Sequence, residues 1–295
     1  MGSQIQVAPN VNVFFHDYQP PNTHSSDDHL TVLCLHGITR NADDFIPMVN
    51  QLHAETDAQS CRFIVPDMRG RGRSDYDENL ENYMVGTYVA DCWKLLDSLE
   101  TQRVAIIGTS MGGIMSILMH EQRPEQVSGI LLNDIGPIVP KQGLAYILTY
   151  LGKFMSEDTW AAALETTKKR LADEYVNLPE KEWEQIALRT YAQRQDGSWS
   201  QRYDKNIRLP MLAAFEQGEE LDLWQAYSAI DKPLLLLRGE RSKLLPQELA
   251  QAMLQQNKHC KMAEIQDRGH VPLLDEPESL MQIKEWLNQM RQQIG

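Results

Sequence analysis

The sequence of 295 residues predicts a doubly wound α/β fold with a mostly parallel sheet and one long helical insertion. Short, continuous apolar runs alternate along the chain with longer amphipathic stretches. Continuous apolar runs are typical of strands that are buried on both faces, and their regular alternation with helices indicates a parallel sheet. The alternation stops between residues 138 and 230, which predicts a separate segment there.

The strands and helices of the core follow from these patterns. Residues 11–15 alternate apolar and polar side chains, which suits an antiparallel strand at a sheet edge. Buried strands are predicted at the continuous apolar runs, which are residues 31–35, 63–66, 104–107, 129–132, 234–237 and 261–265. Helices are predicted where apolar residues recur with helical spacing, at residues 88–99, 111–122, 246–256 and 278–293. We expect these elements to form one core domain from residues 1–137 and 231–295.

Residues 138–230, called the inserted segment below, are expected to be wholly helical. Breaks are predicted near Pro179, Gly197, Pro210 and Gly218, because glycine and proline interrupt helices. The segment holds 12 of the 22 aromatic residues of the chain in less than a third of its length. We therefore expect it to cover one end of the sheet with an aromatic-rich surface.

The composition excludes several classes of protein. Hydrophobic residues make up 42% of the chain and charged residues 23%, which is ordinary for a globular protein. The formal net charge of −13 argues against binding to nucleic acid or to an anionic membrane. Four widely spaced cysteines, with no CxxC pair, indicate free thiols in a reducing compartment. We expect a cytoplasmic protein without nucleic-acid or membrane partners, as a monomer or homodimer.

The strongest chemical signal is the G-x-S-x-G pattern that Gly108, Ser110 and Gly112 form between a predicted strand and a predicted helix. The chain must turn sharply there, and side chains at the two glycine positions would collide across the turn. Such a turn exposes the Ser110 hydroxyl at the start of a helix, where the N–H group of Met111 can stabilise an oxyanion. Ser110 is therefore the candidate nucleophile.

A serine hydroxyl needs a base, and His270 is the best candidate among eight histidines. It follows the last predicted strand, in a loop between Gly269 and Pro272. It also comes after Ser110 in the chain, which matches the order serine, acid, histidine of such sites. His36 ends a strand and is expected to be structural. The next residues, Gly37 and Ile38, offer a second oxyanion donor in the Ile38 N–H group. No histidine spacing indicates a metal site, and no cofactor is expected.

At this point the chain resembles the α/β-hydrolase family over nearly its whole length. The residues that carry the resemblance are His36-Gly37, the segment Asp67-Met68-Arg69-Gly70-Arg71-Gly72-Arg73-Ser74, the Ser110 turn and Gly269-His270. The resemblance implies an eight-stranded, mostly parallel sheet with a helical cap, or lid, inserted after the sixth strand. It also implies that residues 67–74 form a structural loop, in which Asp67 and Arg69 hold the backbone in place.

The sequence departs from the family pattern at the acid that should orient the histidine. The family usually places this acid after the seventh strand, but Lys243 stands where an aspartate is expected. Asp134, at the end of the sixth strand, is the favoured candidate, although its neighbour Asn133 could face the histidine instead. Glu240 is the second choice. The third alternative is a pair of Ser110 and His270 alone, with weakened activity.

The resemblance implies a serine hydrolase that cleaves a carboxylic ester, thioester or lactone through an acyl-enzyme. The aromatic-rich inserted segment favours a small-molecule substrate of small to medium size and apolar character. A carbon–carbon bond hydrolase of the same fold stays an alternative. The other alternative, which the lysine at position 243 suggests, is a ligand-binding homologue with weakened catalysis.

Overall fold

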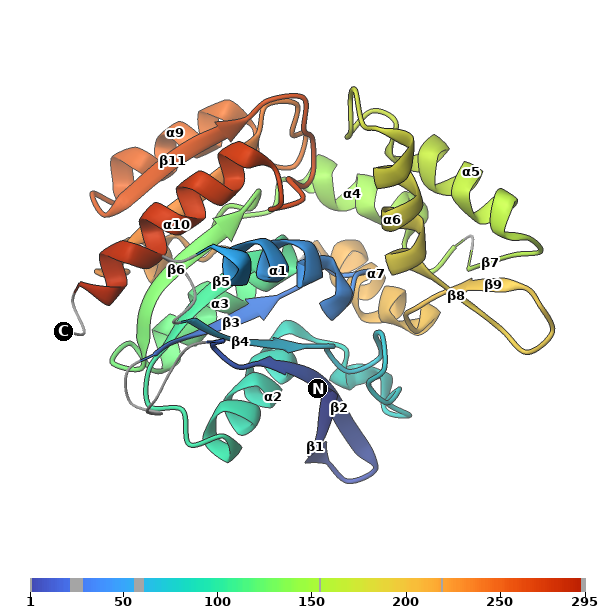
Figure 1. The fold of residues 1–295 in the computed structure, drawn as a ribbon, viewed down its shortest axis with the longest axis horizontal. Coiled ribbons are helices and arrows are strands. Elements are labelled where there is room, and N and C mark those ends of the chain that lie inside the picture. Colours follow the sequence, from blue (N-terminus) through green and yellow to red (C-terminus); the bar gives the residue numbers. More distant parts are fainter. Residues whose placement is uncertain (1, 22–28, 56–60, 154, 219, 293–295) are drawn as a thin grey trace.

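The computed structural model describes residues 2–21, 29–55, 61–153, 155–218 and 220–292. Its centre is an eight-stranded sheet with the strand order β1-β2-β4-β3-β5-β6-β10-β11 (Figure 1). The strands are β1 (Gly2–Ala8), β2 (Val11–Tyr18), β3 (Leu30–Leu35), β4 (Cys61–Pro66), β5 (Val104–Thr109), β6 (Val127–Asn133), β10 (Leu234–Gly239) and β11 (Cys260–Ile265). Both strands next to β2 pair with it antiparallel, and the remaining pairs are parallel. The predicted fold class, with its mostly parallel eight-stranded sheet, is confirmed.

The continuous apolar runs are explained by burial on both faces of the sheet. In β3, Val32 and Cys34 face one apolar layer, whereas Leu33 and Leu35 face the other. Successive side chains of a strand point to opposite faces, so a strand in the middle layer needs apolar residues at every position. The same alternation recurs in β5, β6 and β10.

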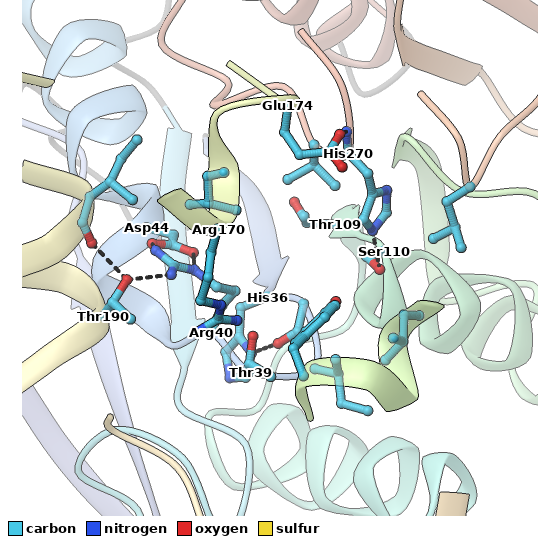
Figure 2. Close-up of a pocket in the computed structure, with 18 of the residues that line it drawn as sticks. His36, Thr39, Arg40, Asp44, Thr109, Ser110, Arg170, Glu174, Thr190 and His270 are labelled. Carbon is cyan, nitrogen blue, oxygen red and sulfur yellow. Dashed lines mark hydrogen bonds and ion pairs between the residues drawn. The ribbon is translucent and has the colours of Figure 1, made fainter. Parts of the chain in front are cut away.

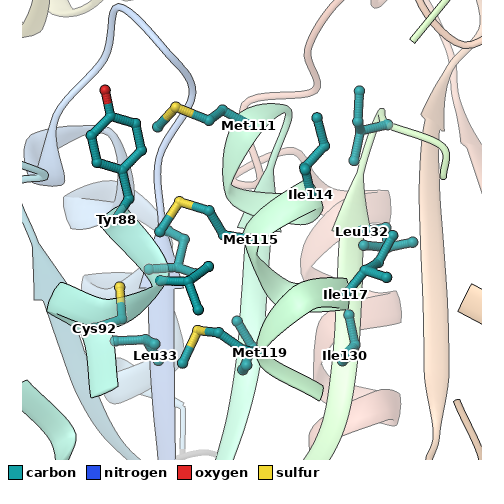
Figure 3. Close-up of a cluster of buried hydrophobic side chains, with 14 of the residues drawn as sticks. Leu33, Tyr88, Cys92, Met111, Ile114, Met115, Ile117, Met119, Ile130 and Leu132 are labelled. Carbon is teal, nitrogen blue, oxygen red and sulfur yellow. The ribbon is translucent and has the colours of Figure 1, made fainter. Parts of the chain in front are cut away.

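Helices cover both faces of the sheet. They are α1 (Ile46–Ala54) and α10 (Pro277–Arg291) on one face, with α2 (Val85–Ser98), α3 (Met111–Gln122) and α9 (Gln247–Gln256) on the other. Short 3₁₀ turns span Ala42–Phe45, Leu80–Asn82 and Lys205–Ile207. Figure 3 shows α3 packing its methionines, Met115 and Met119, beside α2, while Ile114 and Ile117 lie toward β6. The helix that follows Ser110 is thus fixed by apolar contacts along both of its sides.

Two core elements lie outside the sequence predictions. The strand β1 pairs only with β2, so the predicted edge strand lies one position inside the sheet and β1 forms the edge. The Gln4–Val7 stretch of β1 alternates polar and apolar residues, which is the pattern of a strand with one solvated face. The helix α1 is short, and its Pro47 lies in the first turn, where proline is tolerated. Residue 293, the last of the predicted C-terminal helix, lies outside the described residues.

The inserted segment is mostly helical, but the expectation of a wholly helical segment is wrong. Its helices are α4 (Lys141–Tyr150), α5 (Trp160–Leu171), α6 (Glu180–Thr190), α7 (Arg208–Gln217) and α8 (Trp224–Ser228). Three short antiparallel strands, β7 (Ser156–Glu157), β8 (Tyr191–Gln193) and β9 (Trp199–Gln201), form a second sheet. β8 and β9 make a hairpin around Asp196-Gly197, with Gly197 at a φ of 87°. Such an Asp-Gly pair is a hairpin signal that outweighs the local helical pattern.

The inserted segment lies over one end of the sheet, beyond β6 (Figure 1). Its last helix, α8, packs against α3 of the core, and its Ala226 and Tyr227 belong to the same apolar layer as α3. The division into a core of residues 1–137 and 231–295 and an insert of residues 138–230 stays a prediction, with α8 packed on the core. In the part of the chain that the structure describes, no helix has both the length and the apolar character needed to cross a membrane.

Candidate active site

Ser110 lies in the sharp turn between β5 and α3. Its backbone has a φ of 52° and a ψ of −115°, a conformation that residues other than glycine rarely adopt. A Cβ atom on Gly112 would overlap the carbonyl oxygen of Leu35, and one on Gly108 would overlap that of Gly112. The two glycines therefore permit the turn, and the Ser110 hydroxyl projects from it into a cavity.

His270 joins Ser110 to Asp134. Its Nε2 atom lies 2.9 Å from Oγ of Ser110, and its Nδ1 atom lies 2.8 Å from Oδ2 of Asp134. Figure 2 shows the His270 ring directed at the serine hydroxyl. The three side chains come from the ends of β5 and β6 and from the loop after β11, so the fold brings together residues that are far apart in the sequence.

Asp134 is fully buried and follows β6 directly, with a backbone φ of 57°. Its Oδ1 atom accepts a hydrogen bond from the Gly239 N–H group at 2.9 Å. Its Oδ2 atom accepts a second from Oγ of Ser242 at 2.6 Å, in addition to the contact with His270. Asn133 faces elsewhere, because its amide nitrogen donates to Oγ1 of Thr109 and to the carbonyl of Pro272.

The two other positions considered for the acid lie away from the histidine ring. Glu240 is exposed, and its Oε2 atom accepts the N–H of Asp267 at 3.1 Å. The Lys243 side chain is 62% exposed and pairs with Asp173 at 3.3 Å. Because β6 and β10 are parallel neighbours, a carboxylate that follows either strand can reach the same histidine. The lysine after β10 is therefore compatible with a complete hydrogen-bonded site.

The backbone groups expected to hold an oxyanion flank Ser110. Met111 is the first residue of α3, where helical N–H groups have no partner within the helix. A Cβ atom on Gly37 would lie 3.7 Å from Cβ of Ser110, so the Gly37-Ile38 backbone passes close to the nucleophile. The fully buried Arg71 donates from Nε to the Ile38 carbonyl at 3.0 Å. Arg71 thus orients this backbone, a role that its position in the segment 67–74 could have indicated.

The segment 67–74 is held by its own charged side chains. Asp67 accepts the Ala42 N–H at 2.6 Å and the Arg73 N–H at 2.8 Å. Arg69 forms buried ion pairs with Asp91 and Asp77. These contacts agree with the expected structural role of Asp67 and Arg69, and they leave Arg69 unavailable to a ligand.

His36 is held between backbone groups. Its Nδ1 atom lies 2.7 Å from the Gly37 carbonyl, and its Nε2 atom accepts the Met68 N–H at 3.0 Å. Burial lowers the pKa of His36 to about 4, so the ring is neutral near pH 7. A neutral ring with both nitrogens engaged agrees with the expected structural role.

The cavity above Ser110 has a volume of about 670 Å³ and is lined by both the core and the inserted segment. Glu174, which follows α5, is buried there and accepts the His270 N–H at 2.7 Å. Its carbonyl accepts the Gly269 N–H at 2.6 Å. Sequence reasoning assigned Glu174 no role, because nothing near it in the chain indicates that it reaches the histidine loop.

Among the described residues, no three histidine, cysteine or carboxylate side chains are placed to share a metal ion. The cavity instead offers a hydroxyl, an imidazole and a buried carboxylate in hydrogen-bonded sequence. Such a chain can move a proton from the hydroxyl to the imidazole and stabilise the resulting positive charge.

Comparisons with known proteins agree with the architecture. A family model described as the alpha/beta hydrolase fold matches residues 31–277. A 3-hydroxybutyrate-oligomer hydrolase of Cupriavidus necator is 31% identical over 83% of this chain and 84% of its own length. A 2-(acetamidomethylene)succinate hydrolase of Mesorhizobium japonicum is 30% identical over 72% of each chain. The crystal structure of an alpha/beta hydrolase from Novosphingobium aromaticivorans superposes with a TM-score of 0.87 and 30% identity over 98% of both chains. This chain belongs to the α/β-hydrolase family.

Proposed function

We propose that this protein is a serine hydrolase that cleaves carboxylic esters, thioesters or lactones through an acyl-enzyme. The observation that carries the proposal is the hydrogen-bonded chain from Ser110 through His270 to Asp134 beneath the cavity. In the absence of a base, serine is a weak nucleophile. The contact of 2.9 Å between Ser110 and His270 supplies that base.

In the first half of the reaction, Oγ of Ser110 attacks the carbonyl carbon of the substrate. Nε2 of His270 takes the hydroxyl proton, and the carboxylate of Asp134 stabilises the imidazolium that forms. The N–H groups of Ile38 and Met111 hold the negative oxygen of the tetrahedral intermediate. His270 then gives its proton to the leaving oxygen or sulfur, the bond to the leaving group breaks, and the acyl group stays on Ser110.

In the second half, a water molecule replaces the leaving group. His270 takes a proton from this water as the water oxygen attacks the acyl carbon, and the same two N–H groups hold the second tetrahedral intermediate. The bond between the acyl carbon and Ser110 breaks, and the proton on His270 returns to the serine oxygen. The balanced products are an acid and an alcohol or thiol, which for a lactone are the two ends of a single hydroxy acid, with the enzyme unchanged.

The cavity of about 670 Å³ suits a small to medium substrate, because ligand pockets commonly measure roughly 300–1,000 Å³. The Cupriavidus relative is named for 3-hydroxybutyrate oligomers. Short esters of hydroxy acids therefore belong in the first panel of substrates, beside simple alkyl esters of increasing acyl length.

The proposal is tested with p-nitrophenyl butyrate and a fluorophosphonate probe that labels activated serines. We expect the wild-type protein to hydrolyse the ester and to take up one probe molecule at Ser110, located by mass spectrometry of the peptide. Ser110→Ala should abolish both signals, whereas Ser228→Ala, a change at an exposed position of α8, should keep them. Equal rates in wild type and Ser110→Ala would refute the assignment.

A second candidate is hydrolysis of a bond other than an ester, including a carbon–carbon bond. The Mesorhizobium relative favours it, because its name specifies 2-(acetamidomethylene)succinate as the substrate. If the probe labels Ser110 while the ester panel is not hydrolysed, this candidate takes precedence. If the probe does not react and a substrate analogue still binds, the alternative of a ligand-binding protein takes precedence.

A further inference from the structure

We propose that the cavity contains a carboxylate-binding subsite at Arg170, so that the preferred substrate carries an anionic group remote from its scissile bond. This inference rests on the proposed function and adds a substrate class to it. It is carried by the distribution of charge on the cavity wall rather than by the catalytic residues.

Arg170 is a half-buried cation without an acidic partner. It lies near the end of α5 in the inserted segment and lines the same cavity as Ser110. Its guanidinium carbon lies 5.1 Å from the centre of the Tyr150 ring, and its charge also acts on the hydroxyl of Tyr191. Within the described ranges, no carboxylate approaches it to ion-pair distance. Tyrosines orient this guanidinium but do not neutralise it.

Two other charged groups of the cavity, Arg40 and Asp44, are engaged with each other. Arg40 forms two hydrogen bonds of 2.7 Å with Asp44, and its third nitrogen donates to Thr190 at 2.6 Å. Burial alone would raise the pKa of Asp44, but the charge and hydrogen bonds of Arg40, together with the charge of Arg189, outweigh burial and lower it. Asp44 is thus ionised, and both of its oxygens accept hydrogen bonds from Arg40, so it forms no ion pair with Arg170.

A second arginine increases the positive charge of the same wall. Arg189 reaches the Asp44 carboxylate only at 3.6 Å, and its buried Nε atom has no hydrogen-bond partner among the described residues. Glu174, the other carboxylate of the cavity, faces the His270 N–H group. Positive charge therefore exceeds negative charge on this wall, in a chain whose formal net charge is −13.

The position of Arg170 determines which part of a substrate it can bind. Figure 2 shows Arg170 on the side of the cavity where Arg40 and Asp44 lie, across the open space from Ser110 and His270. With the ester carbonyl at Ser110, a group at Arg170 belongs to the far end of the substrate. A guanidinium presents paired N–H donors that match a carboxylate in a bidentate geometry, and such charge-assisted bonds are stronger than neutral ones.

Two matched pairs of esters test the inference. p-Nitrophenyl monoglutarate carries the carboxylate on the acyl side, and p-nitrophenyl 5-methylhexanoate is its neutral shape match. The butyrate ester of 4-hydroxybutanoate carries the carboxylate on the alcohol side, with isohexyl butyrate as its neutral match. The comparison is the ratio of kcat/KM between the anionic and neutral member of each pair, corrected for the rate with Ser110→Ala.

We expect wild type to prefer the anionic member of at least one pair, and that pair identifies the side that bears the carboxylate. Arg170→Gln should lower this preference about tenfold to a hundredfold, the range expected for loss of a charge-assisted hydrogen bond. Arg170→Lys should retain part of it. Lys169→Gln, an exposed neighbour on α5 that does not line the cavity, is the matched control and should keep the wild-type ratio.

A direct binding measurement separates failure of this inference from failure of the proposed function. In the Ser110→Ala background, glutarate should raise Tm, and adding Arg170→Gln should abolish the shift. If no ester is hydrolysed but this shift is seen, the subsite stands and the ester chemistry falls. The inference is overturned if wild type hydrolyses the esters without preferring either anionic member, or if Arg170→Gln slows both members of each pair equally. It is also overturned if no ester is hydrolysed and glutarate gives no shift in Tm.

Discussion

The Asp134 carboxylate accepts hydrogen bonds from Gly239, Ser242 and His270 while it is fully buried. A carboxylate in this position fixes the tautomer of the histidine and stabilises its protonated form. We expect Asp134→Asn, which keeps the shape of the side chain, to lower kcat by about 10³- to 10⁴-fold. The measurement is kcat for p-nitrophenyl butyrate, beside a thermal melt that checks folding.

Two variants serve as controls for that prediction. Glu240→Gln should leave kcat within about twofold, because the carboxylate faces the backbone of Asp267 and not His270. Lys243→Asp should not raise kcat strongly, because that position is exposed. A large gain from Lys243→Asp, or full activity in Asp134→Asn, would instead identify the loop after β10 as the natural place of the acid.

His36 gives a prediction about stability and pH. Its pKa is about 4 in the folded protein, against about 6.5 in the unfolded chain. Between these values the unfolded chain binds a proton that the folded protein does not, so His36 makes stability fall as pH decreases through this window. From pH 7 to pH 5, we expect it to remove about 2 kcal/mol from the free energy of unfolding.

The measurement compares urea unfolding of wild type and His36→Gln at both pH values. Burial raises the pKa of Asp275 to about 6, which acts in the opposite direction, but this contribution is common to both proteins and cancels in the difference. His259→Gln, at an exposed position, is the matched control and should keep the wild-type slope. A His36→Gln protein that loses as much stability as wild type would contradict the prediction.

At the scale of elements, the segment after α5 is bonded to the loop that carries His270. Glu174 accepts the His270 N–H, Tyr175 donates its hydroxyl to the Val271 carbonyl at 3.0 Å, and Val176 donates to the Asp267 carbonyl at 3.2 Å. A Cβ atom on Gly269 would overlap Glu174, so the two segments lie in direct contact. The inserted segment therefore helps to place the imidazole, and Glu174 is a positioning residue.

We expect Glu174→Ala to lower kcat about tenfold to a hundredfold with a smaller change in KM, since small displacements of a catalytic group have effects of this size. Glu174→Gln retains an oxygen acceptor for the His270 N–H and should restore much of the rate. Asp173→Ala, at an exposed neighbour, is the control. A role confined to stability would instead lower Tm and leave kcat of the folded fraction unchanged.

Other elements illustrate which local signals prevail. The hairpin of β8 and β9 forms because Asp196-Gly197 permits a tight turn between residues that include Tyr191 and Trp199, which favour strands. The strand β1 needs β2 as a partner, so its short alternating pattern gains stability only through pairing. Both elements carried a readable signal, but each signal was shorter than the periodic pattern of a helix or a buried strand.

At the scale of the whole molecule, the four cysteines are probes of global unfolding. All four are buried free thiols, with Cys34 and Cys61 in one apolar layer and Cys92 and Cys260 in the other. Burial raises the pKa of Cys61 to about 11 and those of Cys34 and Cys92 well above the ordinary value. Formation of the reactive thiolate is thus suppressed, and burial keeps thiol reagents away from the sulfur atoms.

We expect Ellman's reagent to leave the native protein unmodified and to titrate all four thiols in denaturant. In intermediate urea, the rate should follow the unfolded fraction measured by circular dichroism, because both apolar layers share the central sheet. A thiol that reacts rapidly in native buffer would reveal local opening of its layer and contradict the prediction.

The sequence by itself determined most elements of the core, though not β1 and α1, as well as the Ser110 turn and the choice of His270. These features are encoded locally, by apolar periodicity, by glycines where side chains would collide, and by a histidine in a constrained loop. Only the tertiary structure decided which carboxylate meets His270, that Glu174 contacts its loop and that Arg170 lacks an acidic partner in the cavity. The physical reason is that these contacts depend on strand order, on the parallel pairing of β6 with β10 and on how the inserted segment packs over the sheet. None of these is encoded in the residues next to Asp134, Glu174 or Arg170.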